Sequence, residues 1–267
     1  MNRPWIGVLG HPLTHSLSKK IQTSHLSQHH LKWDFRILDV HPSSFENEIT
    51  KILDDPFCKG FSVTMPYKEK VGLKVTAADE LSQSTGVINC VKQGEGEWLG
   101  FNTDGPGFLE GLWSWSLKPP LDVVVLIVGI GATAKTLSTV LAREGYQKFL
   151  FLNRTKQKAL QWQDRFRVLF PHVEVSVLSW GERVPVTENL FLLNTIPIGI
   201  YSIPSPILFR SFKKNIWCFD VAYISDDTEF LRQAKEHHFH TFNGWPMFLA
   251  QAKRAFEIWV NSYRPAC

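Results

Sequence analysis

The chain has 267 residues, more than the ~100–200 of one typical domain, so we expect two domains. Its net charge of +4 includes no dense Lys or Arg run, which argues against a nucleic-acid partner and fits a small anionic ligand. The cysteines lie far apart, with no CxxC pair, at Cys58, Cys90, Cys218 and Cys267. This spacing argues against a disulfide framework or a zinc site and favours a reducing, cytoplasmic location. We expect neither a secretion signal nor a membrane span, because every apolar run is too short.

The first hundred residues alternate between short apolar strands and helices. Strands are predicted at Trp5–Leu9, Phe35–Val40 and Gly60–Thr64. One helix is predicted to run from a capping Ser18 to about Leu31, and another from a capping box at Ser43–Glu46 to about Asp54. Val87–Val91 and Glu97–Phe101 are predicted to form a hairpin around Gly94–Gly96. The alternation predicts a mostly parallel α/β sheet.

A second α/β series follows a helix predicted over Asp104–Leu117, on which we place a domain boundary. Strands are predicted at Val123–Val128, Lys148–Leu152, Val173–Val177, Leu190–Asn194 and Ile216–Val221. Helices are predicted at Ala132–Glu144, Lys156–Phe166, Thr228–Glu236 and Met247–Val260. The last helix should bury the face that carries Leu249, Ala252, Phe256 and Val260.

A glycine-rich turn follows the first strand of this second series. Gly129-Ile130-Gly131 comes directly after Val123–Val128, and a helix begins at Ala132. Such a turn lets the backbone approach a pyrophosphate, and the helix N-terminus offers N–H groups to it. Ala134 replaces the third glycine of the fingerprint. The pattern favours a Rossmann-type dinucleotide site over a plain structural turn.

The end of the next strand indicates which dinucleotide binds. An NAD site usually has Asp or Glu there, whereas this chain has Asn153-Arg154-Thr155. Arg154 could pair with a 2′-phosphate, and Thr155 and Lys158 could add donors. The alternative is an exposed turn with an ordinary arginine. We expect NADP.

Seven segments spread over nearly the whole chain carry polar residues at predicted strand ends or helix starts. They are GHPLTHSLSKKI, GFSVTMPYKEKV, GVINCV with LGFNTDGPGF, NRT, LLNTIPIGI, FDVAYISDDTEFL and NGWPMFLAQAKRAFEIW. In order and spacing they resemble the motifs of the NADP-dependent shikimate dehydrogenases. The resemblance implies two α/β domains, the C-terminal one of Rossmann type, with an active-site cleft between them. It also implies the reversible reduction of 3-dehydroshikimate to shikimate by NADPH, in the shikimate pathway of aromatic amino-acid biosynthesis.

The resemblance assigns roles to individual residues. It implies Lys68 as the acid/base group and Asp104 as its partner, although each alone could be an ordinary surface lysine or helix cap. The implied substrate-binding residues are Ser16, Ser18, Thr64, Asn89, Tyr223 and Gln251. The cofactor-binding residues expected from the turn, the strand end and the resemblance are Gly129, Gly131, Ala132, Asn153, Arg154, Thr155, Lys158 and Gly244. The intact pair of serines favours shikimate over quinate.

Gln251 lies on the last predicted helix, which should therefore return to the first domain. We expect a substrate domain of residues 1–104 joined by 241–267, and an NADP domain of residues 105–240. His237, His238 and His240 are interpreted as a solvated helix end, and no metal is expected. We expect a monomer or homodimer with a small-molecule substrate and neither nucleic acid nor membrane as a partner.

Several positions depart from the family pattern. They are His11, Lys19, Ser62, Cys90, Ile196, Ile200, Ile224 and Ser225. Ile196 and Ile200 lie where the nicotinamide is expected, so cofactor affinity and hydride geometry are the properties that we expect these departures to affect most. Two alternatives stay open: a quinate/shikimate or aminoshikimate dehydrogenase, and a non-catalytic metabolite sensor. The Lys68–Asp104 pair argues against a sensor, which does not need proton-transfer groups.

Overall fold

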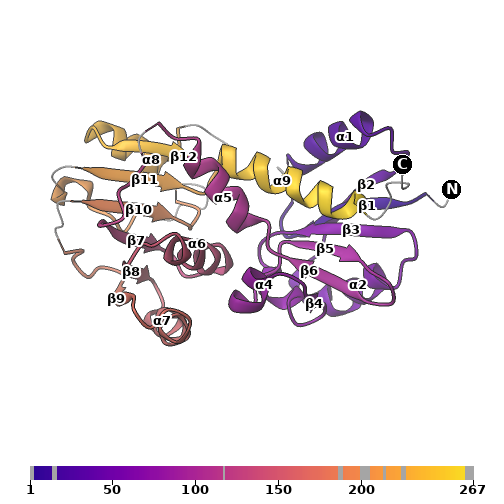
Figure 1. Ribbon diagram of the computed structural model, residues 1–267, viewed down its shortest axis with the longest axis horizontal. Helices are drawn as coiled ribbons and strands as arrows, with labels where there is room; N and C mark the ends of the chain where they lie inside the picture. The colour runs from indigo at the N-terminus through magenta and orange to yellow at the C-terminus, as the bar shows by residue number, and fades with distance from the viewer. Residues whose placement is uncertain are drawn as a thin grey trace. The chain divides into compact units, whose positions relative to one another are not determined.

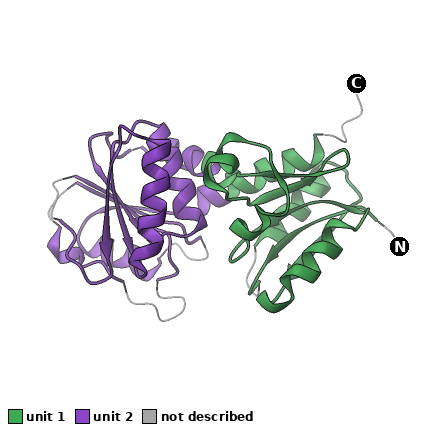
Figure 2. Ribbon diagram, turned by 90° about the horizontal axis from the view of Figure 1, so that it is seen from below, with its two compact units in different colours: residues 1–106, 249–267 green, residues 107–248 purple. Residues whose placement is uncertain are grey.

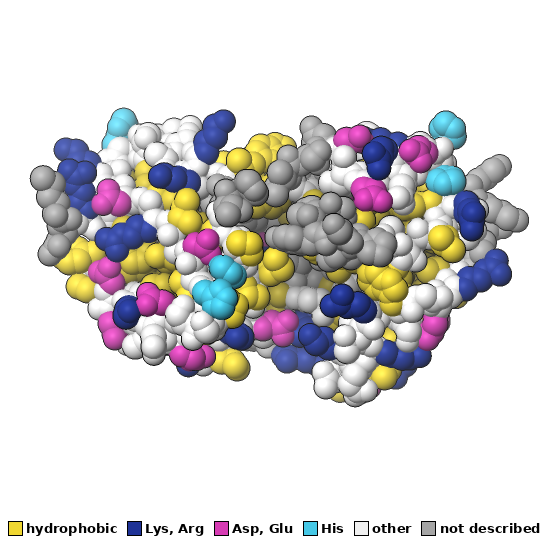
Figure 3. All heavy atoms as spheres, turned by 180° about the vertical axis from the view of Figure 1, so that it is seen from behind, with side chains coloured by type: hydrophobic (Ala, Val, Ile, Leu, Met, Phe, Trp, Pro, Cys, Tyr) yellow, Lys and Arg dark blue, Asp and Glu magenta, His cyan; other side chains and the backbone are white. Residues whose placement is uncertain are grey.

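The computed structural model describes residues 3–13, 17–116, 118–185, 189–198, 205–212, 215–223 and 227–261. The chain forms two compact units (Figure 2). Unit 1 comprises Met1–Pro106 and Leu249–Cys267, and unit 2 comprises Gly107–Phe248. Within the described ranges, every helix is too short or too polar to cross a membrane. Basic and acidic side chains are interspersed on the face in Figure 3, in keeping with the small net charge.

Unit 1 is built on a six-stranded sheet in the order β2-β1-β3-β5-β6-β4 (Figure 1). Its strands are β1 (Trp5–Gly10), β2 (Asp34–Asp39), β3 (Cys58–Val63), β4 (Thr76–Ala77), β5 (Cys90–Gln93) and β6 (Trp98–Phe101). The β2, β1 and β3 strands are parallel, but β5 runs antiparallel to both β3 and β6. Because β4 pairs parallel with β6, β5 alone runs against the other strands of this sheet, and the expectation of a mostly parallel sheet is confirmed. The predicted hairpin around Gly94–Gly96 is present, and it reverses the chain between β5 and β6.

The helices of unit 1 begin differently from the prediction. They are α1 (Ser18–Gln28), the 3₁₀ turn η1 (Pro42–Ser44), α2 (Phe45–Leu53), α3 (Lys68–Val71) and α4 (Glu80–Thr85). Leu17 is the N-cap of α1, so Ser18 is a helical residue and not the cap. The capping box predicted at Ser43–Glu46 is also wrong. His41 accepts a hydrogen bond from the Ser43 amide, and the 3₁₀ turn then leads straight into α2.

The C-terminal part of α9 (Trp245–Val260) packs on unit 1. Its buried side chains Ala255, Phe256, Trp259 and Val260 form a core cluster with residues of β1, α1 and β5. The Trp259 indole N–H donates to the Val91 carbonyl at 2.9 Å. Leu249, predicted to share this buried face, is instead 39% exposed. It is the first residue of the segment that belongs to unit 1.

Unit 2 holds a fully parallel six-stranded sheet in the order β12-β11-β10-β7-β8-β9. Its strands are β7 (Val124–Val128), β8 (Lys148–Asn153), β9 (Glu174–Ser179), β10 (Leu190–Asn194), β11 (Ile216–Asp220) and β12 (His240–Asn243). The accompanying helices are α5 (Asp104–Trp113), α6 (Ala132–Arg143), α7 (Lys156–Leu169), η2 (Phe209–Ser211) and α8 (Glu229–Glu236). The order is that of a doubly wound Rossmann sheet, whose switch point lies between β7 and β10. This confirms the predicted Rossmann-type unit.

The central strands of unit 2 are buried on both faces, which explains their continuous apolar sequence. Val125 to Val128 of β7 and all of β10 are buried. The glycine-rich turn follows β7, and the polar Asn194 ends β10 at the same edge of the sheet. That edge of a doubly wound sheet is where ligands bind.

Candidate active site and cofactor turn

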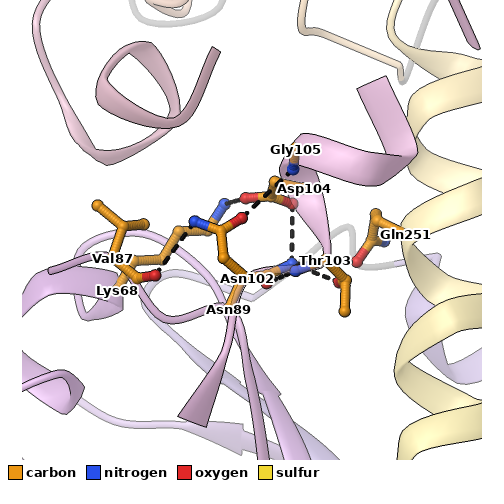
Figure 4. Close-up of polar contacts among 8 residues, drawn as sticks. All are labelled: Lys68, Val87, Asn89, Asn102, Thr103, Asp104, Gly105 and Gln251. Carbon is orange, nitrogen blue, oxygen red and sulfur yellow. Dashed lines mark hydrogen bonds and ion pairs between the residues drawn. The ribbon is translucent and has the colours of Figure 1, made fainter. Parts of the chain in front are cut away.

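An ion pair joins two of the residues singled out in the sequence. Lys68 begins α3, directly after the buried Tyr67, and its Nζ lies 2.6 Å from Oδ2 of Asp104 at the start of α5 (Figure 4). The side chains are only 15% and 7% exposed. A charged hydrogen bond shielded in this way holds the ammonium in one place and supplies a proton donor beside a hydrogen-bonding carboxylate.

Asn89 connects this pair to the neighbouring Thr103 and to α9. Its Nδ2 donates to Oδ1 of Asp104 and to Oγ1 of Thr103, both at 2.9 Å, and lies 3.5 Å from Oε1 of Gln251 on α9. Its Oδ1 accepts from the Thr103 amide at 2.7 Å. The four residues Lys68, Asn89, Asp104 and Gln251 thus lie in one hydrogen-bonded group, although Asn89 and Gln251 are 162 positions apart.

Backbone contacts explain why these segments converge. The Ile88 amide donates to the Lys68 carbonyl at 2.9 Å, and the Asn89 amide donates to the Phe101 carbonyl at 3.1 Å. The first contact ties α3 to the segment before β5. The second ties that segment to the end of β6, where Thr103 and Asp104 follow. These main-chain contacts around the hairpin bring the segments of Lys68, Asn89 and Asp104 together.

The other predicted substrate residues are spread over both units. Ser18 is half-buried in the first turn of α1, and Thr64 is half-buried just after β3. Ser16 lies outside the described residues. Tyr223 belongs to unit 2, where its ring stacks on Phe248 at 4.0 Å between centroids.

Sequence reasoning left out two buried polar residues of the group, Asn102 and Thr103. Both are 3% exposed, and they precede Asp104 in the run Asn-Thr-Asp. Three polar residues in a row directly after an apolar strand were the available signal. Of the three, the family resemblance assigns a role only to Asp104.

The glycine-rich turn of unit 2 has two glycines with different functions. Gly129 has φ +88°, and a Cβ there would lie 2.3 Å from Cγ2 of Ile196. This position needs glycine for its backbone conformation and for close packing. Gly131 is the N-cap of α6, and a Cβ there would meet nothing within 4 Å. The open space in front of the α6 N-terminus, which begins at Ala132, suits a pyrophosphate.

The end of β8 supports this turn and offers cations. Oδ1 of Asn153 accepts from the Ile130 amide at 3.1 Å, and its Nδ2 donates to the Thr155 carbonyl at 2.8 Å. Arg154 and Lys158 are exposed, whereas Lys156 pairs with Glu182 at 3.2 Å. The first turn of α7 holds no acidic residue. These residues fit a dinucleotide whose ribose carries a phosphate better than one with free hydroxyls.

Gly244 and the histidines at the end of α8 lie where the backbone turns between elements. A Cβ at Gly244 would lie 2.3 Å from the Val221 carbonyl oxygen, so glycine is required where β12 turns into α9. His237 is the C-cap of α8, and His238 follows it with φ +58°. Among the residues that the structure describes, no group of three or more His, Cys, Asp and Glu side chains could hold a metal ion.

Fold and site together define a class: a two-unit α/β oxidoreductase with a Rossmann-type dinucleotide unit. Residues 8–91 match the shikimate dehydrogenase substrate binding domain. The shikimate dehydrogenase (NADP(+)) of Oceanobacillus iheyensis is 29% identical over 259 residues, which are 96% of this chain and 91% of that protein. That of Bacillus licheniformis is 29% identical over 97% of this chain and 92% of its own length.

Solved structures agree in fold along nearly the whole chain. The shikimate dehydrogenase of Aquifex aeolicus has a TM-score of 0.82 at 27% identity, covering 98% of this chain and 94% of that one. The Thermus thermophilus enzyme, solved in complex with NADP(H) and shikimate, has a TM-score of 0.80 at 27% identity, covering 97% and 94%. Along nearly its whole length the chain is thus similar to shikimate dehydrogenases in sequence and in fold.

Proposed function

We propose that this protein is an NADP-dependent shikimate dehydrogenase that reversibly reduces 3-dehydroshikimate to shikimate. The observation that carries the proposal is the shielded Lys68–Asp104 pair, with Asn89 and Gln251 in the same hydrogen-bonded group. A substrate that is a small ring with several hydroxyls needs such neighbouring donors and acceptors. We infer that the enzyme acts in the shikimate pathway, in the cytoplasm, as a monomer or homodimer.

Lys68 would act as the acid/base group. Reduction of the ketone leaves negative charge on its oxygen, and the Lys68 ammonium supplies the proton that neutralises it. In the reverse direction the neutral amine accepts the hydroxyl proton. Asp104 holds the lysine in place by the 2.6 Å contact and accepts a hydrogen bond from a ring hydroxyl.

The remaining residues would fix the ring. Asn89 and Gln251 present amide donors and acceptors to further hydroxyls, together with Thr64 and Tyr223. Ser16 and Ser18 would bind the carboxylate through their hydroxyl groups, in keeping with a helix start at Ser18. NADPH supplies the hydride when bound. Gly129, Gly131, Ala132, Asn153 and Gly244 would shape its site, and Arg154, Thr155 and Lys158 would bind the 2′-phosphate.

The test is an absorbance assay at the NADPH band, with shikimate and quinate each offered NADP and NAD. The proposal expects the fastest reduction of NADP with shikimate. Faster turnover of quinate, or of aminoshikimate offered in the same assay, would assign the protein to the neighbouring activity instead. Binding of shikimate without turnover would favour a metabolite sensor.

A further inference from the structure

A second layer of polar contacts lies behind Asp104. Asn102 follows β6 and is 3% exposed. Its Nδ2 donates to the Val87 carbonyl at 3.1 Å, and its Oδ1 accepts from the Gly105 amide at 3.3 Å (Figure 4). One buried side chain therefore joins the segment that leads to Asn89 with the first turn of α5, which carries Asp104.

Asp79 holds Asn102 in turn. It is the N-cap of α4, and its Oδ1 accepts from the Ser82 amide at 2.7 Å. Its Oδ2 accepts from the Asn102 amide, also at 2.7 Å. A carboxylate bound by two backbone N–H groups makes charge-assisted hydrogen bonds, which are about twice as strong as neutral ones. The short helix α4 is thereby anchored to the strand end that leads into the active-site group.

We propose that Asp79 is a positioning residue that, through Asn102, sets the place of Asp104 against Lys68. The inference rests on the function proposed above. Asp104 lies between Asn89 at 2.9 Å and Lys68 at 2.6 Å, and both contacts depend on where α5 begins. Because Asn102 carries both the backbone bond to Asp79 and the side-chain bond to Gly105, a shift at Asn102 moves that start. Misplacing catalytic groups by about 1 Å costs up to ~10²-fold in rate.

The first test is Asp79→Asn. The amide keeps one oxygen with which to cap α4, but its NH₂ group replaces the acceptor that faces the Asn102 amide. We expect kcat for shikimate oxidation to fall about 10-fold, with KM for shikimate changed less than about threefold. We expect kcat to change more than KM because losing the Asp79–Asn102 hydrogen bond shifts Asp104 relative to Lys68.

Ser82→Ala is the matched control for helix damage. The Ser82 hydroxyl donates to the Asp79 carbonyl at 2.8 Å and lies 3.3 Å from the Gly100 carbonyl, so its removal loosens α4 and its contact with β6 while Asp79 keeps its contact with Asn102. The proposal expects a lower melting temperature but a near-normal kcat. If Asp79→Asn changes kcat no more than Ser82→Ala does, Asp79 is only a helix cap and the proposal is overturned.

A substrate-free measurement separates this proposal from the proposed function. Acetic anhydride labels free amines, and mass spectrometry gives the labelling rate of Lys68 relative to the exposed Lys70. In Asp79→Asn the carboxylate of Asp104 is displaced and protects the Lys68 amine less. The ratio of Lys68 to Lys70 labelling should therefore rise severalfold over wild type. An unchanged ratio overturns the positioning role. A wild-type protein that oxidises no shikimate refutes the proposed function alone, since the labelling ratio still decides the role of Asp79.

Discussion

At the scale of single residues, a variant of Lys68 should distinguish catalysis from substrate binding. Lys68→Ala removes the proton donor and leaves Asn89, Asp104 and Gln251 to hold the ring. We expect kcat to fall by ~10²–10⁴-fold, which is the usual contribution of a general acid. Shikimate affinity, measured by calorimetry, should change much less. Lys70→Ala, on the same short helix but exposed, is the control and should be near wild type. A normal kcat in Lys68→Ala would remove this residue from proton transfer.

Arg154 is the residue at which cofactor choice should be decided. It stands in the turn after β8, where an NAD-specific protein would carry a carboxylate. Arg154→Asp replaces a partner of the 2′-phosphate by a group that repels it. Binding titrations should show NADPH weakened far more than NADH. Arg165→Asp makes the same charge change on α7 and serves as the control. Equal losses for both cofactors would mean that Arg154 does not contact the 2′-phosphate.

At the scale of elements, the βα turn should respond differently at its two glycines. Gly129→Ala forces an L-residue to φ +88° and its Cβ against Ile196, so the free energy of unfolding should fall by at least about 1–3 kcal/mol. Gly131→Ala adds a methyl group in open space, so stability should hold. That methyl group would face the pyrophosphate, and NADPH affinity should fall instead. Denaturation and cofactor titration of both variants check this. If both variants lost stability and NADPH affinity to the same extent, the two glycines would not have different roles.

Sequence patterns predicted the buried elements best. The strands β7 and β10 were placed within a residue, because strands buried on both faces of a parallel sheet are continuous apolar runs. The helix starts in unit 1 were placed wrongly because capping depends on local backbone geometry, such as the 3₁₀ turn that precedes α2. The helix α4 was missed altogether. It has six residues, and its capping box uses Asp79 with Ser82 where Glu or Gln is usual.

The site itself could not be derived from patterns. Alone, Lys68 and Asp104 have the sequence context of an ordinary surface lysine and a helix cap, and only the family resemblance brought them together. What joins them is tertiary: a hairpin register, backbone contacts between segments far apart, and an α9 side chain 162 positions from Asn89. Local propensity contains none of this information. The cofactor turn could be predicted because the residues that form it are consecutive in the sequence.

At the scale of the whole molecule, each unit has its own core and a buried thiol within it. Cys58 lies in unit 1 and Cys218 in unit 2, and both are fully buried. Burial raises the pKa of both thiols, so neither is a reactive thiolate in the native state. Labelling of each cysteine by iodoacetamide therefore reports the opening of its own unit.

Matched tryptophan variants use these reporters. Trp259→Phe deletes the indole donor to Val91 in unit 1, and Trp162→Phe deletes the indole donor to Ser138, at 3.1 Å, in unit 2. Each loss of a buried hydrogen bond should cost about 1–3 kcal/mol. If the units open separately, Trp259→Phe will speed labelling of Cys58 and spare Cys218, and Trp162→Phe will do the reverse. If either variant speeds both cysteines equally, the two units unfold as one, and the division into separately stable halves is wrong.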